Sequence, residues 1–151
     1  MKTSDSIFLR ALNKESLEIP PIWYMRQAGR YMPEYRAVRK KFKNFLDMCK
    51  NPEVCCELAL QPINAFNLDA SILFSDILTI PDAFGLGVEF LEGEGPVFKN
   101  PIKTPKDISS LPEFNSDDLS YVYEAVSNIK RALPENIPLI GFCGSPWTLA
   151  A

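Results

Sequence analysis

The residues of this chain best suited to chemistry are two arginines that stand on either side of a glycine. Arg26 and Arg30 flank Gly29, which allows the backbone to come close to a bound group. Each guanidinium carries a planar fork of donors that matches a carboxylate. Because two arginines at the end of a buried segment are costly without an anionic partner, the pattern favours an anion site. A structural ion pair with Glu34 is the alternative that the residues leave open.

A carboxylate is the second candidate group. Asp76 follows an apolar run at 70–74, which is typical of a buried strand, with Ser75 between them. Without further context, an aspartate in this place can also serve only as a loop cap. The chain contains no histidine, so histidine-based acid–base chemistry and histidine-ligated metal are excluded within these residues.

Three short apolar strands are expected to position these groups. They lie at about 22–25, 70–74 and 138–143, and helical segments separate them. Strands that do not alternate with polar residues indicate a parallel sheet covered on both faces. The carboxyl ends of parallel strands share one edge, which here would carry Arg26, then Ser75 and Asp76, then the Gly144–Ser145 pair. The pattern leaves open either an open doubly wound sheet or a (β/α) barrel.

The segments between the strands carry clear helix and turn signals. Asn51 is a capping residue, Pro52 suits the first helical position, and Glu53 complements the positive end of a helix. A basic helix is expected at about 34–42. The stretch 81–112 is rich in glycine and proline and predicts a hairpin outside the main scaffold.

Composition places the chain among soluble globular proteins. Its 151 residues fit one domain, with 46% hydrophobic and 23% charged residues. No apolar run approaches the ~20 residues that cross a bilayer. The four cysteines are sparse and fit packing better than a disulfide framework or zinc site, so a reducing cytoplasm is the expected location.

Charge is unevenly distributed along the chain. The first 50 residues hold 11 Lys and Arg against 5 Asp and Glu, whereas the remainder hold 5 against 14. No nucleic-acid module accompanies the basic part, and its helical cluster around Arg39 is interpreted as solvated. A small polyanion steered toward Arg26 and Arg30 is therefore the preferred ligand class.

Several blocks of the chain resemble one enzyme family. The stretch Arg26–Tyr31, preceded by Ile22–Met25, resembles the N-terminal signature of uroporphyrinogen decarboxylases, and the segments 51–62, 74–78 and 138–149 resemble further blocks of that family. The resemblance implies decarboxylation of the four acetate side chains of uroporphyrinogen III to methyls, giving coproporphyrinogen III and CO2 in haem biosynthesis. It also implies no cofactor, no metal, no nucleic-acid or membrane partner, a cytoplasmic location, and a homodimer when full length.

The resemblance further implies an α/β fold of the (β/α)8 TIM-barrel type. A complete barrel takes ~250 residues and eight strands. Residues 1–151 are therefore expected to be the N-terminal part of a single barrel domain, covering about its first three β/α units. By resemblance, the family's tyrosine falls one residue beyond Ala151, and its serine and histidine lie further on. The chain alone is accordingly not expected to be active.

The resemblance assigns roles to residues of both candidate groups. Asp76 would accept hydrogen bonds from the pyrrole N–H groups of the substrate, and Arg26 and Arg30 would bind its carboxylates and take part in catalysis. The residues expected to add backbone contacts around those carboxylates are Gln27, Ala28 and Gly29.

Two other functions stay open at this point. One is a corrinoid or thiol methyltransferase on a similar barrel, which would bind zinc through cysteine and histidine further along; the Arg26–Arg30 stretch argues against it. The other is a non-catalytic module that binds the carboxylates of a tetrapyrrole. Conversion of uroporphyrinogen to coproporphyrinogen would distinguish the decarboxylase from both.

Overall fold

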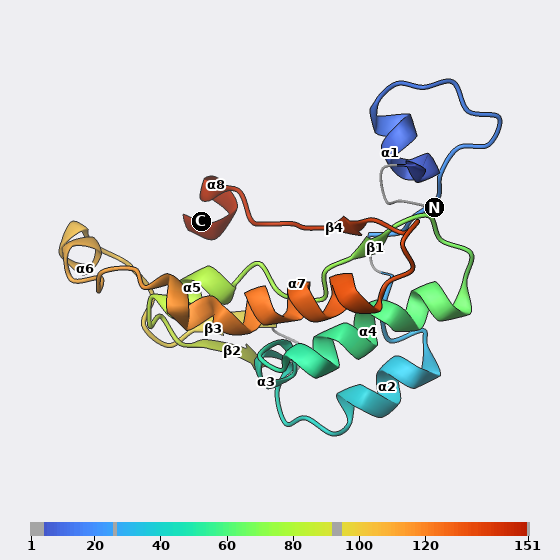
Figure 1. Ribbon diagram of the computed structural model, residues 1–151. Helices are drawn as coiled ribbons and strands as arrows, with labels where there is room; N and C mark the ends of the chain where they lie inside the picture. Colours follow the sequence, from blue (N-terminus) through green and yellow to red (C-terminus); the bar gives the residue numbers. More distant parts are fainter. Residues whose placement is uncertain (1–4, 26, 92–94, 151) are drawn as a thin grey trace.

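The protein consists mainly of helices with two small sheets, and the longer helices lie on one side of one of these sheets, as Figure 1 shows. The computed structural model describes residues 5–25, 27–91 and 95–150. In chain order its elements are α1 (Ile7–Leu12), α2 (Pro33–Arg39), α3 (Phe45–Cys49), α4 (Pro52–Ala65), β1 (Ser71–Ile72), α5 (Thr79–Ala83), β2 (Val88–Leu91), β3 (Gly95–Phe98), α6 (Pro105–Ser109), a 3-10 turn (Ser116–Leu119), α7 (Ser120–Ala132), β4 (Leu139–Ile140) and α8 (Pro146–Ala150).

Strands β1 and β4 form a parallel pair, as the sequence predicts. Ser71 is opposite Leu139 and Ile72 is opposite Ile140. The N–H of Leu73 donates to the carbonyl of Ile140 at 2.9 Å, which extends the pairing by one residue. The segments that follow the two strands, including Asp76 after β1, therefore leave the pair at the same edge.

The prediction of a strand at Ile22–Met25 is wrong, since the structure has no strand there. Only Ile22 pairs with the segment before β1: its carbonyl accepts the N–H of Asp69 at 2.9 Å, and its N–H donates to the Asp69 carboxylate at 2.7 Å. Beyond this point a side chain, that of Gln27, takes the hydrogen-bonding positions of β1 that a strand would need. Met25 is left exposed.

Helix α4 begins as predicted. The Asn51 side chain accepts the N–H of Val54 at 3.0 Å, and Pro52 occupies the first turn. The basic helix α2 begins at Pro33, one residue before the expected start, and ends at Arg39, three residues before the expected end. The predicted hairpin is present as β2 and β3, which are antiparallel.

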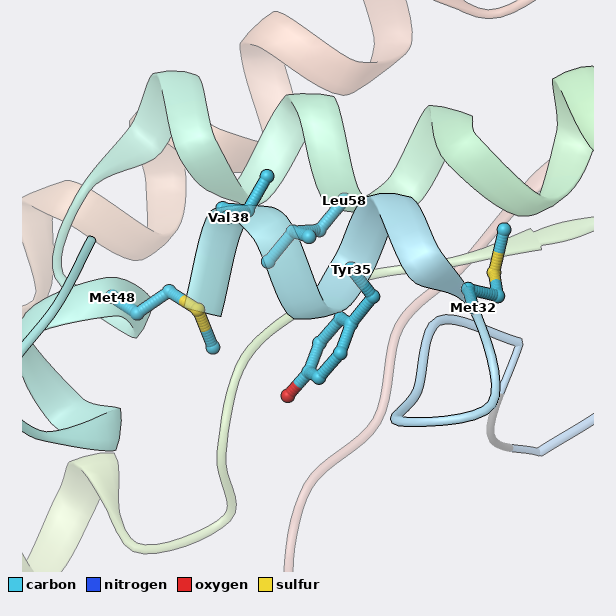
Figure 2. Close-up of a cluster of buried hydrophobic side chains, with 5 residues drawn as sticks. All are labelled: Met32, Tyr35, Val38, Met48 and Leu58. Carbon is cyan, nitrogen blue, oxygen red and sulfur yellow. The ribbon is translucent and has the colours of Figure 1, made fainter. Parts of the chain in front are cut away.

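The core consists of two clusters that share helix α4. In the first, drawn in Figure 2, α2 and the residue before it pack against α3 and α4; its buried members are Met32, Tyr35, Val38, Met48 and Leu58. In the second, α4 packs against α7 beneath the parallel pair; its buried members are Cys55, Ala59, Leu73, Ala125 and Ile129. The prediction that the helical cysteines serve packing is confirmed for Cys49 and Cys55, which are both buried.

Candidate functional site

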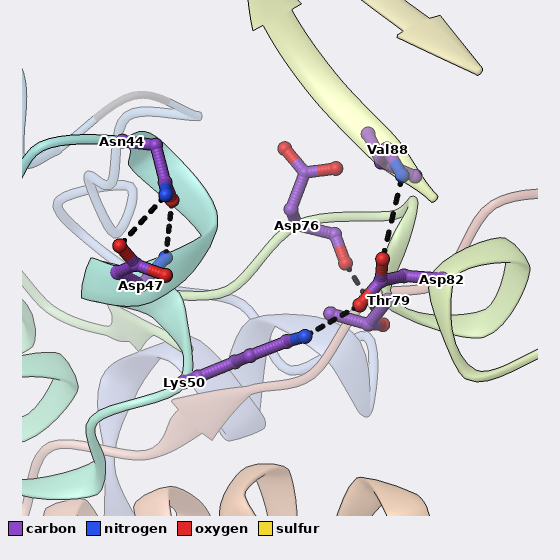
Figure 3. A network of polar contacts seen from close by, with 7 residues as sticks. All are labelled: Asn44, Asp47, Lys50, Asp76, Thr79, Asp82 and Val88. Atoms are coloured by element: carbon purple, nitrogen blue, oxygen red, sulfur yellow. Dashed lines mark hydrogen bonds and ion pairs between the residues drawn. The ribbon is translucent and has the colours of Figure 1, made fainter. Parts of the chain in front are cut away.

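Asp76 lies four residues beyond β1, in a half-buried position. One carboxylate oxygen accepts the N–H of Leu78 at 2.8 Å, while its backbone carbonyl accepts the hydroxyl of Thr79 at 3.1 Å. In Figure 3 the carboxylate points away from the neighbouring ion pair of Asp82 and Lys50, whose atoms are 2.6 Å apart. None of the described residues donates to the second oxygen of Asp76, which is therefore available as an acceptor.

Burial raises the pKa of the Asp76 carboxyl, and the hydrogen bond from Leu78 partly opposes this effect. Burial disfavours the charged form, whereas a donor to the carboxylate favours it. Keeping the Asp76 carboxyl ionised, as an acceptor must be, therefore lowers the free energy of unfolding of the chain.

Replacing Asp76 by asparagine is accordingly expected to stabilise the chain at neutral pH. The raised pKa means that the folded state binds the proton more tightly than the unfolded state, so stability from this group is present at low pH and lost as the pH rises through the folded pKa. Asparagine can keep the bond from Leu78 without a charge. Urea unfolding at a series of pH values measures the free energy of unfolding of the two proteins. The stability gained by the variant should vanish at pH values below the usual pKa range of carboxyl groups. A gain that does not change with pH would contradict burial of the charge as its cause.

The segment at 27–31, called the arginine loop below, is held by several hydrogen bonds; Arg26, which precedes it, lies outside the described residues. The carbonyl of Gly29 accepts the N–H of Met32 at 2.9 Å, and the carbonyl of Arg30 accepts the Arg36 guanidinium at 2.8 Å. Arg30 itself is exposed. The loop therefore holds its backbone in one shape and leaves this guanidinium at the surface.

Two of the residues between the arginines face the interior. Ala28 packs against the first core cluster, and its neighbour Gln27 is only 2% exposed. The Gln27 amide donates to the carbonyl of Ala70 at 2.7 Å and accepts the N–H of Ile72 at 3.1 Å. The sequence predicts only backbone contacts from Gln27, so this role of its side chain was missed.

A tyrosine on α2 contacts the segment that leads from β1 to Asp76. The rings of Tyr35 and Phe74 lie with centroids 6.1 Å apart, and Phe74 precedes Asp76 by two residues. Burial raises the pKa of the Tyr35 phenol, and the positive charges of Arg39 and Arg30 oppose this rise. Arg30 and Arg39 therefore both lie within electrostatic reach of this ring.

The pKa of the Cys49 thiol is affected by charges of both signs, among them the negative charge of Asp76. Burial is the main cause that raises its pKa, Cys55 and Asp76 raise it further, and Arg39 lowers it. Asp76 and Arg39 thus act on one buried group. Sequence reasoning treated Arg39 as solvated, but it is half-buried and donates to the carbonyl of Phe42 at 2.8 Å. Its place one turn after Tyr35 is the signal that could have identified it.

The segment that follows β4 carries a serine with a structural role. The hydroxyl of Ser145 accepts the N–H of Thr148 at 3.2 Å and lies 2.8 Å from the Thr148 hydroxyl, which caps the start of α8. Within the described ranges, no three or more His, Cys, Asp and Glu residues are grouped so as to hold a metal ion. No helix in this part of the chain has the length and apolar character needed to span a membrane.

Comparison with solved structures identifies the fold. A methyltransferase from Methanosarcina mazei matches with a TM-score of 0.69 over 95% of this chain and 44% of its own, at 20% sequence identity. At this identity the likeness concerns the fold alone. The chain therefore shares a mixed helix and strand architecture with part of that larger protein.

Sequence comparison identifies the family. The chain is 60% identical over 143 residues to a uroporphyrinogen decarboxylase from Vesicomyosocius okutanii, 59% over 147 residues to one from Francisella philomiragia, and 57% over 152 residues to one from Legionella pneumophila. These matches cover 95%, 96% and 97% of this chain but 41%, 42% and 42% of the relatives. The chain thus spans about two-fifths of their length. The family model for uroporphyrinogen decarboxylase matches residues 3–151, and the chain belongs to this family.

Proposed function

We propose that the protein carrying this chain removes the four acetate carboxyl groups of uroporphyrinogen III, giving coproporphyrinogen III and CO2. Residues 1–151 would be the N-terminal part of a single (β/α)8 barrel domain; of the three parallel strands that the sequence predicts for it, the described residues form two, β1 and β4. The observation that supports this best is the family match over residues 3–151. The parallel pair β1–β4, with Asp76 beyond its carboxyl end, fits such a barrel.

Binding would use charges of both signs. Arg26 and Arg30 would grip acetate and propionate carboxylates, since each guanidinium can donate two parallel hydrogen bonds to one carboxylate. The half-buried Arg39 would add to the positive field near the loop. The backbone of the loop would contribute further contacts to the same carboxylates, through Gln27, Ala28 and Gly29.

Asp76 would bind the middle of the macrocycle. An ionised carboxylate only accepts hydrogen bonds and has about four lone-pair sites, which suits the N–H groups that converge at the centre of a porphyrinogen. The second oxygen of Asp76, which receives no bond from the described residues, could take such donors without losing the bond from Leu78.

Asp76 would also stabilise the charge that develops during the reaction. Protonation of a pyrrole carbon next to the acetate arm gives a cationic ring. The bond between the arm and its carboxylate then breaks, its electron pair returns to the ring, and CO2 leaves. A second proton adds to the resulting methylene and gives the methyl group, and the first proton then leaves the ring carbon, which restores the neutral pyrrole. A fixed negative charge beside the ring lowers the energy of this cation, as an oxyanion hole does for an anion.

The proposal is tested by activity in a protein of the relatives' length. Residues 1–151 would be joined to the remaining segment of the Legionella relative, with which they share 57% identity. This chimaera is expected to convert uroporphyrinogen to coproporphyrinogen, measured by separating the oxidised porphyrins. A folded chimaera that produces no heptacarboxylate or later product would refute the proposal. The 151-residue chain alone is expected to be inactive in the same assay.

Arg30→Gln is expected to weaken binding of uroporphyrin by roughly tenfold, because a hydrogen bond between charged groups contributes about 1.5–3 kcal/mol. The dependence of affinity on salt should also become shallower. Fluorescence titration of the chimaera at several salt concentrations measures both. Arg131→Gln, on the exposed end of α7, is the matched control and should leave affinity unchanged. Equal affinity of the two variants would remove Arg30 from the binding site.

The family resemblance also supports a homodimer in the cytoplasm for the protein that carries this chain. Sedimentation of the active chimaera would test the dimer, since a monomer at assay concentration would contradict it.

A further inference from the structure

Strand β1 has two hydrogen-bonding sides, and β4 satisfies only one of them. The N–H groups of Ser71 and Leu73 donate to the carbonyls of Pro138 and Ile140, each at 2.9 Å. Since peptide groups alternate along a strand, the carbonyl of Ala70 and the N–H of Ile72 face the other way. Both would need partners from a further strand if the sheet continued on that side.

The side chain of Gln27 supplies both partners. Its amide nitrogen lies 2.7 Å from the carbonyl oxygen of Ala70, and its amide oxygen lies 3.1 Å from the nitrogen of Ile72. A residue of a neighbouring parallel strand makes the same two bonds, one to the residue before its partner and one from the residue after it. The Gln27 amide therefore makes the two hydrogen bonds to β1 that one residue of a neighbouring parallel strand would make. At 2% exposure it also has both functions satisfied within the interior.

The loop behind this amide is linked by hydrogen bonds among its own residues and to α2. The hydroxyl of Tyr31 donates to the carbonyl of Gln27, and the carbonyls of Gly29 and Arg30 accept from the N–H of Met32 and the guanidinium of Arg36. Met32 is itself buried in the first core cluster. A change in where Gln27 meets β1 would therefore displace the backbone of the whole arginine loop.

We propose that the side chain of Gln27 is a positioning residue, which attaches the arginine loop to β1 and so sets where Arg30 lies relative to Asp76. Asp76 follows Ile72 by four residues on the same segment. The amide thus acts on carboxylate binding through the guanidinium, without touching the substrate. The consequence for the substrate rests on the proposed function, whereas the attachment itself does not.

Nuclear magnetic resonance of the 151-residue chain tests the attachment. In Gln27→Met, which keeps the length and removes the amide, the N–H of Ile72 is expected to exchange with solvent on the order of tenfold faster. The amide resonances of residues 28–30 should shift as well. Gln61→Met is the matched control, because the amide oxygen of Gln61 is buried without a partner among the described residues. It should change neither observation.

Either of two results would overturn the attachment. One is an unchanged exchange rate at Ile72, and the other is faster exchange with the resonances of residues 28–30 unmoved, since Gln27 would then serve β1 alone. If Gln27→Met does not fold, scalar couplings across the two hydrogen bonds of Gln27 in the unaltered chain decide the question. Couplings to Ala70 and from Ile72 are expected, and their absence would refute the proposal.

Binding of uroporphyrin to the chimaera tests the action through Arg30. The effects of Gln27→Met and Arg30→Gln on affinity should be less than additive. Once Arg30 has been displaced, its guanidinium contributes little to binding, so removing it changes the affinity little further. Fully additive effects would show that Gln27 does not work through Arg30 and would overturn that part. Absence of binding by the unaltered chimaera would refute the proposed function instead, and the resonance experiment would still decide whether Gln27 holds the loop.

Discussion

Asp76→Asn is expected to reduce the kcat of the chimaera for uroporphyrinogen by roughly 10²–10³-fold, the usual loss when one group that stabilises a developing charge is removed. Asparagine has nearly the shape of aspartate and can keep the bond from Leu78, so the loop should retain its conformation. What it loses is the negative charge that the proposed mechanism places beside the cationic ring. Single-turnover rates measured by separation of the oxidised porphyrins would report the change.

Asp82→Asn is the matched control for this experiment. Asp82 lies six residues further along and pairs with Lys50, so its replacement removes a carboxylate from the same region without touching the proposed site. Its kcat should stay near that of the unaltered chimaera. If the two variants lose activity equally, the effect belongs to the net charge of the region, and Asp76 has no special place in the mechanism.

The same carboxylate should shape the acid side of the pH profile. In the proposed mechanism activity needs the ionised form, and burial raises the pKa of Asp76. Activity should therefore fall with decreasing pH at a higher pH than an ordinary exposed aspartate would cause. The predicted gain in stability of Asp76→Asn at neutral pH has the same origin, so function and stability oppose each other at this residue.

Leu58→Ala is expected to lower the free energy of unfolding by about 2–5 kcal/mol, the range for a leucine removed from a tightly packed core. Leu58 lies on α4, is fully buried and belongs to the first core cluster, where α4 packs against α2 and α3. Met48, another member of this cluster, is also fully buried, so the truncation would remove contacts from a closed part of the core. Urea unfolding of the 151-residue chain, followed by circular dichroism, measures the loss.

Leu12→Ala provides the comparison for this core substitution. Leu12 ends α1 and is 66% exposed, so its truncation should change the free energy of unfolding by no more than about 0.5 kcal/mol. Similar losses in the two variants would mean that the first core cluster does not hold the fold together.

Patterns that depend on neighbouring residues predicted the fold well. The start of α4 could be predicted because its signal is local: a capping side chain, a proline and an acid in consecutive positions. The parallel pair was predictable because its two segments are continuously apolar. The hairpin formed by β2 and β3 followed from the glycines that separate its arms.

Features that depend on distant partners were missed. Residues 22–25 have the composition of a strand, but a strand exists only where a neighbour offers its backbone, and a side chain occupies that edge of β1. Nothing near Gln27 in the sequence indicates that its amide meets residues 43 and 45 positions away. Arg39 was misjudged for the same reason, since its burial depends on how α2 packs.

The pairing of α4 with α7 has a consequence for how the chain folds. These helices build the second core cluster, yet all of residues 66–119 lie between them. Contacts between such remote segments slow folding, because a long loop must close before the contacts form. Closure entropy grows only with the logarithm of loop length, so doubling the intervening loop would cost roughly 0.6 kcal/mol. The segment between the two helices should therefore accept an inserted peptide with little loss of stability, which makes it a natural place for a tag or reporter.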